Sequence, residues 1–364
     1  MKKKLLLGIG SSLLVLSLAG CGATTDTSNA IDSKEQVESI EESKAENDTP
    51  KIESAESSEE EKEPELTPAI PEVQEQEVLA DDYVIAFTDE YILEKVREIT
   101  GITEGDITYE AVKNITEFEI PDNCSDTSYL KYFTGLEKLS CGAGIELEDI
   151  DMNILQNLTK LKLVCTNLTS LEEIGKLTKL TDLDLECDNL TSLEGLENLI
   201  NLTDLRLVSS SLTTVEGIGN LPNLSFLGLW CDSLTSIEGI GELPSLTFLF
   251  LRSSNLASLK GVENFDTLTE VDMWYCNNLT SIEEIGALSN LAILKVGECN
   301  SLASLAGVEK LSKLTDLEVQ CCNNLSSLKE IGNLYKQVRF FVHNCNKITD
   351  DEIHAFYDGK YAFE

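Results

Sequence analysis

The phrase LTDLRLVSSSLTTVEGIGNLPN (residues 202–223) returns as LSFLGLWCDSLTSIEGIGELPS (224–245), LTFLFLRSSNLASLKGVENFDT (246–267) and LTEVDMWYCNNLTSIEEIGALSN (268–290). The period is 22 residues for three copies and 23 for the fourth. Self-similarity at a period of roughly 20 to 50 residues is typical of solenoids, in which each copy is one supersecondary unit stacked on the next. This stretch therefore predicts a stacked repeat domain.

The repeat extends beyond this stretch in both directions. Within the copy that starts at Leu224, the alternating Leu227 and Leu229 predict a strand of about three residues, and the later apolar residues bring the chain back across the opposite side. Every copy thus supplies one parallel strand to a single sheet. Strand patterns begin imperfectly at Ile115 and Leu136, and regular copies begin at Leu158, Leu180, Leu202, Leu224, Leu246, Leu268, Leu291 and Leu314, with a last copy from Gln337.

The pattern L-x-x-L-x-L-x-x-x-x-L-x-x-I-x-x-I-x-x-L-x-x resembles leucine-rich repeats, and its period resembles the internalin type of bacterial surface proteins. The resemblance implies an α/β repeat fold, a curved right-handed solenoid with a parallel β-sheet on the concave face and short 3₁₀ turns on the convex face. From Leu268 onward the copies lengthen to 23 residues and resemble the cysteine-containing subtype, most clearly over residues 341–350. We see no LPxTG signal and no immunoglobulin-like domain, so wall anchoring and the internalins' host receptors are not carried over.

Short helical patterns at both ends of the repeats predict caps, which a solenoid needs to cover its open apolar ends. Residues 83–114 form the expected N-terminal cap, in which Ile92, Val96 and Ile99 recur at helical spacing, Thr88 is a plausible N-cap and Gly101 ends the run. A second short helix is expected from residue 108 to 114. The solenoid proper is expected over 115–348, and a capping box at 349–352 starts a C-terminal cap helix over 349–364.

The first 21 residues read as an export signal. Lys2, Lys3 and Lys4 precede an apolar run over 5–18 that is too short to span a bilayer comfortably, and Leu18-Ala19-Gly20-Cys21 closes it. This segment resembles the bacterial lipoprotein signal. The resemblance implies that residues 1–20 are removed, that Cys21 is lipidated on its sulfur, and that the protein is anchored by its lipid to the extracellular face of the cell membrane. The alternative is an ordinary secretory signal with a chance cysteine.

Residues 21–82 are expected to be a disordered acidic linker. The stretch 22–82 holds 20 Asp and Glu against 4 Lys, a net charge of −16, and no aromatic residue. Such a composition buries too little apolar surface to offset the entropy lost on ordering. The linker would be a spacer between the membrane and the repeats, with a partner-binding acidic tail as the less favoured alternative.

The charge and histidine content narrow the class of function. A formal charge of −38 argues against nucleic acid or anionic lipid as a direct partner of the folded part. The chain has two histidines, His343 and His354, and therefore few side chains that could act as a general acid or base near neutral pH. No catalytic triad, phosphate loop or paired-carboxylate motif stands out against the repeat. We therefore expect a binding protein without cofactor or metal, and a hydrolase hidden in the repeat is the least favoured alternative.

The cysteines fall on repeat positions. The family resemblance implies that Cys276, Cys299, Cys322 and Cys345 point inward and bond the backbone, as buried thiols can. Cys165 and Cys187 share a position in successive copies, so their Cα atoms could be about 5 Å apart, and either a disulfide or two thiols fits. Cys124, Cys141, Cys231 and Cys321 have no partner that spacing assigns. A metal site at Cys321, Cys322, His343 and Cys345 is disfavoured because the first and third should face away from the other two.

The residues that alternate with the inward leucines should form columns on the concave face, with neighbours about 4.8 Å apart. These columns bring aromatic residues together and leave a dent at Gly228, and Arg252, between the two indoles, is expected to make cation–π contacts with them. An exposed aromatic cluster usually marks a binding site, although packing that merely stiffens the sheet is the alternative. The predicted ligand-binding residues are Phe226, Trp230, Phe248, Phe250, Arg252, Trp274 and Tyr275.

Acidic residues flank this aromatic cluster. They are Asp182, Asp184 and Glu186 before it, and Glu270, Asp272, Asp316 and Glu318 after it. An aromatic centre with a charged rim is the arrangement expected of a protein or peptide interface, and the sign of the rim favours a basic ligand. The sequence thus predicts a surface protein that binds a protein ligand in adhesion or cell contact. A carbohydrate- or cell-wall-binding module is the alternative, since sugar rings also stack on indoles.

Overall fold

The computed structural model describes residues 79–122, 124, 126–145 and 150–361. The predicted signal at 1–20, the lipidation site Cys21 and the acidic linker up to residue 78 lie outside the described residues, as do the last three residues of the predicted C-terminal cap. The described residues belong to one compact unit. None of the helices in this part of the chain combines the length and the apolar composition of a membrane span.

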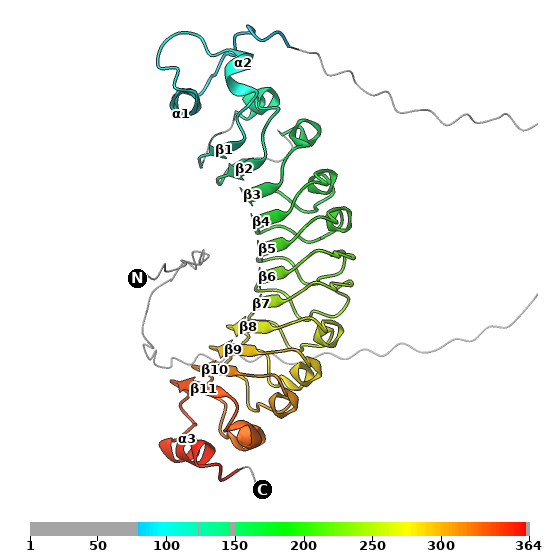
Figure 1. The fold of residues 1–364 in the computed structure, drawn as a ribbon, viewed down its shortest axis with the longest axis vertical. Helices are drawn as coiled ribbons and strands as arrows, with labels where there is room; N and C mark the ends of the chain where they lie inside the picture. Colours follow the sequence, from blue (N-terminus) through cyan, green and yellow to red (C-terminus); the bar gives the residue numbers. More distant parts are fainter. Residues whose placement is uncertain (1–78, 123, 125, 146–149, 362–364) are drawn as a thin grey trace, which may run out of the picture. The chain divides into compact units, whose positions relative to one another are not determined.

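The repeats build one eleven-stranded parallel sheet whose strands follow the order of the chain. Figure 1 shows the strands along one side of the stack and the returning segments along the other, with the stack bent toward the strands. The leucine-rich repeat solenoid predicted from the sequence is therefore confirmed. The strands are β1 (Glu117–Ile120), β2 (Lys138–Cys141), β3 (Lys160–Cys165), β4 (Asp182–Cys187), β5 (Asp204–Ser209), β6 (Phe226–Cys231), β7 (Phe248–Arg252), β8 (Glu270–Trp274), β9 (Ile293–Gly297), β10 (Asp316–Gln320) and β11 (Arg339–His343).

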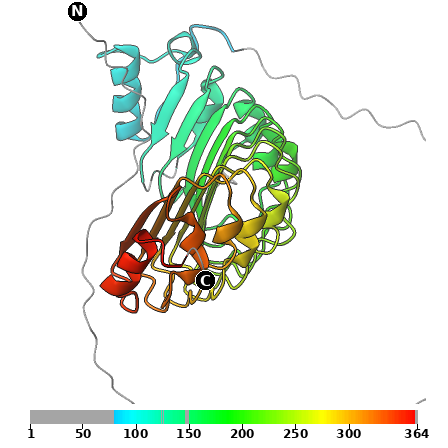
Figure 2. The ribbon, with the colours of Figure 1, turned by 60° about the horizontal axis from the view of Figure 1, so that its bottom comes forward.

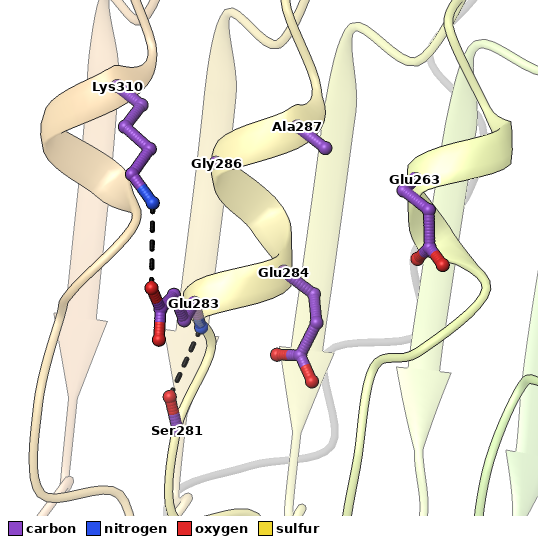
Figure 3. A pocket seen from close by; sticks show the side chains of 7 residues that line it. All are labelled: Glu263, Ser281, Glu283, Glu284, Gly286, Ala287 and Lys310. Atoms are coloured by element: carbon purple, nitrogen blue, oxygen red, sulfur yellow. Dashed lines mark hydrogen bonds and ion pairs between the residues drawn. The ribbon is translucent and has the colours of Figure 1, made fainter.

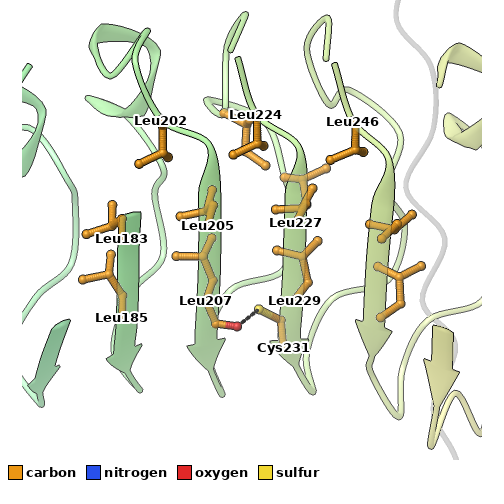
Figure 4. Close-up of a cluster of buried hydrophobic side chains, with 14 of the residues drawn as sticks. Leu183, Leu185, Leu202, Leu205, Leu207, Leu224, Leu227, Leu229, Cys231 and Leu246 are labelled. Atoms are coloured by element: carbon orange, nitrogen blue, oxygen red, sulfur yellow. Dashed lines mark hydrogen bonds between the residues drawn. The ribbon is translucent and has the colours of Figure 1, made fainter. Parts of the chain in front are cut away.

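The leucine ladder sets the register of the sheet. Leu205 of β5 pairs with Leu227 of β6, which pairs with Leu249 of β7, and all three are fully buried. Figure 4 shows these columns of inward side chains. A slip of one residue would turn every leucine outward, so the pattern allows one register only. The strands have four to six residues rather than about three, and in the six-residue strands the inward alternation continues one step further, for example to Cys231 in β6.

Most returning segments contain a 3₁₀ helix, as predicted for the convex face. In the described residues, the returns between β5 and β6 and between β6 and β7 lack one. The first of these holds Gly219 with φ of 70° at the position that Glu197 occupies in η5, and this left-handed residue interrupts the right-handed turn. The 3₁₀ helices are η1 (Ser128–Tyr132), η3 (Met152–Leu155), η4 (Ile174–Lys176), η5 (Leu196–Asn198), η6 (Val262–Asn264), η7 (Glu283–Ala287), η8 (Val308–Lys310) and η9 (Lys329–Leu334).

Both ends of the stack carry helices (Figure 2). At the β1 end lie α1 (Glu90–Thr100) and α2 (Tyr109–Val112). The N-cap of α1 is Asp89 rather than the predicted Thr88, because the Asp89 carboxylate accepts from two backbone N–H groups of the first turn. The Thr88 hydroxyl instead donates to Asp126. Gly101 ends α1 in the left-handed region with φ of 74°, as predicted, but Ile99 is exposed rather than packed.

At the β11 end, α3 (Asp350–Tyr357) covers the core with Ala355 and Phe356. Thr349 is its N-cap, since the hydroxyl accepts from the backbone N–H of Glu352 at 3.2 Å. The ring of Phe356 packs edge-on against Phe340 of β11, with 5.0 Å between centroids. The apolar end of the solenoid is thereby closed.

The extra residue of the 23-residue copies has one conformation throughout. It follows the strand and takes a left-handed backbone, with φ between 52° and 58°. This single residue lets the following cysteine return to the inward position. The four cysteines concerned, which we call the ladder cysteines, are all buried: Cys276, Cys299, Cys322 and Cys345. The extra residues are Tyr275, Glu298, Cys321 and Asn344.

Candidate ligand-binding face

Strands β6, β7 and β8 bring the predicted aromatic residues together on the sheet face opposite the core. Phe226 pairs with Phe248 across β6 and β7, and Trp230 and Trp274 both pair with Arg252 of β7. The columns predicted from the repeat are thus confirmed. We call Phe226, Trp230, Phe248, Phe250 and Trp274 the aromatic patch. All five side chains are half-buried, while Arg252 and Tyr275 beside them are exposed.

The aromatic patch consists of two stacked pairs and a separate indole. The rings of Phe226 and Phe248 lie 5.0 Å apart between centroids and within 10° of parallel. The rings of Trp230 and Phe250 lie 4.3 Å apart and 24° from parallel. Stacked aromatic pairs contribute roughly 0.5–1.5 kcal/mol beyond their buried area. Stacking therefore favours this arrangement of the four rings in the free protein.

The dent predicted at Gly228 is filled. The six-membered ring of Trp230 leans back over Gly228, so that a Cβ added there would lie 2.5 Å from its Cζ3 atom. Gly228 is buried as a result. Gly228 does leave space on the concave face, as predicted, but the ring of Trp230 occupies that space.

Trp274 is fixed by a hydrogen bond and by the sheet beneath it. Its indole Nε1–H donates to the Asp272 carboxylate two residues earlier on β8. Its ring lies over Gly297 of β9, where an added Cβ would overlap three adjacent ring carbons. Since the indole donor is already used, Trp274 offers a ligand mainly the surface of its ring.

The cation–π contacts differ from the predicted ones. The guanidinium of Arg252 lies 5.1 Å from the ring centroid of Tyr275 rather than over an indole. The left-handed backbone at Tyr275 turns that ring back toward β7, which explains the difference. A second contact, which the sequence did not indicate, places Arg206 of β5 4.5 Å from the ring of Phe226.

Charged side chains border the aromatic patch toward β9. Lys295 pairs with Glu270 at 2.6 Å. Partial burial lowers the pKa of Lys295, but the carboxylates of Glu270, Asp272 and Glu318 together outweigh it, so that the net pKa is raised. Burial raises the pKa of Asp272 to about 6, against the attraction of Lys295 and the hydrogen bond from Trp274. Asp272 therefore titrates in mildly acidic solution, next to the aromatic patch.

The acidic flanks lie where the sequence placed them. Strands β4 to β10 carry eight Asp and Glu against three Lys and Arg, a difference of −5. Lys160 pairs with Asp182 at 2.8 Å, whereas no ion pair within the described part of the chain involves Asp184 or Glu186. The border of the aromatic patch thus keeps an excess of negative charge toward β4.

The cysteines at the shared repeat position are buried, as the family resemblance implied, whereas Cys321 is half-buried. The ladder thiols donate to backbone carbonyls, for example Cys322 to Val296 at 3.7 Å and Cys345 to Val319 at 3.8 Å. Cys231, to which repeat spacing assigns no partner, donates to the Leu207 carbonyl at 3.8 Å (Figure 4).

The other cysteine positions also follow the repeat. Cys165 and Cys187 are register partners with their Sγ atoms 2.7 Å apart. His343 is exposed and Cys321 half-buried, while Cys322 and Cys345 are buried, so these four side chains do not converge.

A shallow groove lies among the returning segments, between successive 3₁₀ helices. Figure 3 shows its lining side chains, with Lys310 of η8 reaching Glu283 of η7 at 3.5 Å. The hollow has a volume of about 560 Å³ and is mostly open. Its lining contains none of the predicted binding residues. The lining residues are Glu263, Ser281, Glu283, Glu284, Gly286, Ala287 and Lys310.

Several solved structures are similar in fold. An internalin from Listeria monocytogenes, InlF, is 16% identical over 75% of this chain and 94% of its own, with a TM-score of 0.47. Internalin C2 from the same bacterium is 20% identical over 67% and 100%, with a TM-score of 0.46. The functional domain of InlJ from Listeria monocytogenes, which includes a cysteine ladder, is 20% identical over 72% and 61%, with a TM-score of 0.36. No family model matches the sequence, and neither does any curated protein. In its fold, the described part of the chain is a leucine-rich repeat solenoid.

Proposed function

We propose that this chain is a bacterial surface lipoprotein whose concave face binds a protein ligand through the aromatic patch. The observation that carries the proposal is the gathering of five large aromatic side chains from three adjacent strands on the face opposite the core. Packing of the solenoid does not require them, because the core is already filled by the leucine ladder on the other face. Aromatic surface of this kind lowers solubility, and its usual reason is a partner.

The acidic side chains that border the aromatic patch favour a ligand with basic residues. The strands around it carry a net excess of acidic side chains, and Asp184 and Glu186 lack an ion pair in the described part of the chain. Charge complementarity at the rim increases association rates and selects among partners more than it adds affinity. A basic protein segment with apolar or planar side chains fits both parts of this face.

The test compares the chain from residue 22 onward with its triple variant Trp230→Ala, Phe250→Ala and Trp274→Ala. The probes are an arginine-rich peptide, a glutamate-rich peptide of equal length, and purified bacterial cell-wall polysaccharide. We expect the wild-type chain to bind the arginine-rich peptide and the triple variant to lose this binding with an intact fold. Tyr91→Ala with Phe341→Ala is the matched control, because both are exposed aromatic residues outside the aromatic patch. Equal binding by all three chains would refute the proposal.

A carbohydrate-binding module is the second candidate, favoured by the half-exposed ring surfaces of Trp230 and Trp274. Selective retention of the wild-type chain on polysaccharide, with no peptide binding, would support it over the first. The proposed anchor is tested separately. Cys21→Ala in the full chain should abolish labelling by radioactive palmitate and release the protein from membranes. Membrane attachment that survives this change would argue against a lipid on Cys21.

A further inference from the structure

Each of the two tryptophans lies against a glycine of the sheet. A Cβ on Gly228 would lie 2.5 Å from Cζ3 of Trp230 and 3.1 Å from Cε1 of Phe226, well inside contact distance. A Cβ on Gly297 would overlap the Cε3, Cζ3 and Cδ2 atoms of Trp274. Because those three atoms are consecutive in the ring and are met together, Trp274 rests on Gly297 with its face rather than its edge.

The backbone does not demand glycine at these two positions. Gly228 lies within β6 and Gly297 ends β9, and neither has the left-handed φ that excludes other residues. Glycine inside a strand normally weakens it, so its presence there points to a close approach of another group. The group here is an indole ring in both cases.

The register partners of the two glycines on the adjacent strands show how much space the missing side chains leave. Gly228 stands between Arg206 of β5 and Phe250 of β7, and both carry long side chains. Gly297 stands between Trp274 and Gln320. A side chain of ordinary size at either position would fill the space above the strand and force the neighbouring indole to stand away from the sheet.

We propose that Gly228 and Gly297 are positioning residues of the binding face: the missing side chain of Gly228 makes room for the edge of the Trp230 ring, which stacks on Phe250, and that of Gly297 lets Trp274 lie on the sheet and present its outer ring face. This inference rests on the proposed function in taking the aromatic patch as the binding site. With its Nε1–H held by Asp272, Trp274 recognises a ligand by stacking rather than by donating a hydrogen bond. The planar, cationic guanidinium of arginine fits such a ring beside an acidic border.

The experiment uses the free protein first. Gly297→Ala is made in the wild-type chain and in Trp274→Ala, and Gly228→Ala in the wild-type chain and in Trp230→Ala. We expect each glycine variant to shift tryptophan emission to longer wavelength and to increase quenching by acrylamide, because the lifted indole meets more water. In the background without the facing indole, the same glycine change should leave the emission of the remaining tryptophan unaltered. This background also keeps the test valid if a clash unfolds the single variant.

Binding of an arginine-rich peptide is then measured on the same four variants. Each single glycine variant should bind roughly three- to tenfold more weakly than wild type, the effect of losing one stacked cation–π contact. In the matching indole-free background the glycine change should have no further effect on affinity. The positioning role is overturned if emission and quenching are unchanged, or if the loss of affinity persists without the indole. A fluorescence change as expected, in a wild-type chain that binds polysaccharide and not the peptide, overturns the arginine assignment alone.

Discussion

Replacing Asp272 with asparagine should make the domain more stable at neutral pH and leave its stability unchanged in acid. Asp272 lies on β8 between Phe250 of β7 and Lys295 of β9. Besides Lys295, the charged groups that act on it are Glu270 and Glu318, and its oxygen accepts the Trp274 indole N–H. Burial dominates these contributions and raises the Asp272 pKa from the ordinary 3.8 to about 6.

The direction in which folding stability changes with pH follows from proton binding to Asp272. Between pH 3.8 and about 6 the folded chain holds a proton on Asp272 that the unfolded chain releases. Stability from this group is therefore complete below pH 3.8 and is lost as the pH rises through about 6. At about 1.4 kcal/mol per pKa unit, the loss at neutral pH is about 3 kcal/mol. This is the gain expected for Asp272→Asn, because asparagine resembles the protonated carboxyl group and the attraction of Lys295 is already contained in the shifted pKa.

Urea unfolding from pH 4 to pH 8, followed by circular dichroism, measures this difference. The free energies of unfolding of Asp272→Asn and wild type should coincide near pH 4 and separate as the pH rises, with the variant more stable. Asp184→Asn, in the same column on β4, is the matched control and should change the free energy of unfolding by no more than about 0.5 kcal/mol. A separation that does not depend on pH, or a wild type more stable at neutral pH, would refute the reasoning.

Three further predictions concern the scaffold. Leu229→Ala removes a fully buried ladder residue and should lower the free energy of unfolding by about 3 kcal/mol in urea titrations. Glu298→Pro should destabilise by about 3 kcal/mol or more, because proline cannot adopt φ of 53° or donate to the Gln320 carbonyl as Glu298 does at 2.8 Å; a smaller change in the melting curve than for Glu298→Gly would contradict this. Diamide, as the oxidant, should join Cys165 to Cys187, since their Sγ atoms already lie 2.7 Å apart, and peptide mapping under non-reducing conditions identifies the bond.

The architecture could be predicted because it depends on spacing alone. Leucine recurs at fixed positions, so the count of residues between copies fixes which strand pairs with which and which face is buried. The columns on the concave face followed from the same count, and every predicted pair among Phe226, Phe248, Trp230, Arg252 and Trp274 is a register pair. The spacing of the leucines therefore predicts the position of each Cα atom in the sheet and the face of the sheet on which its side chain lies.

Spacing does not determine where a side chain turns after it leaves the sheet. Arg252 stands between two indoles in the column, yet its guanidinium lies over the ring of Tyr275, a residue whose left-handed backbone the leucine spacing does not reveal. Trp230 likewise turns back over Gly228 instead of leaving it open. The choice between Thr88 and Asp89 as the N-cap of α1 is of the same kind, since both can accept the bond and only the local geometry decides.

The change from 22 to 23 residues per repeat also shapes the binding face. It begins at β8, where the extra residue is Tyr275 and its left-handed backbone carries the ring toward Arg252 of β7. In the later copies the same position holds Glu298, Cys321 and Asn344, which offer no comparable ring. The insertion therefore does two things at its first occurrence. It returns Cys276 to the core, and it adds an exposed aromatic side chain to the edge of the aromatic patch. Removing only the extra residue should disturb the patch at β8 and leave the stacked pairs of β6 and β7 in place.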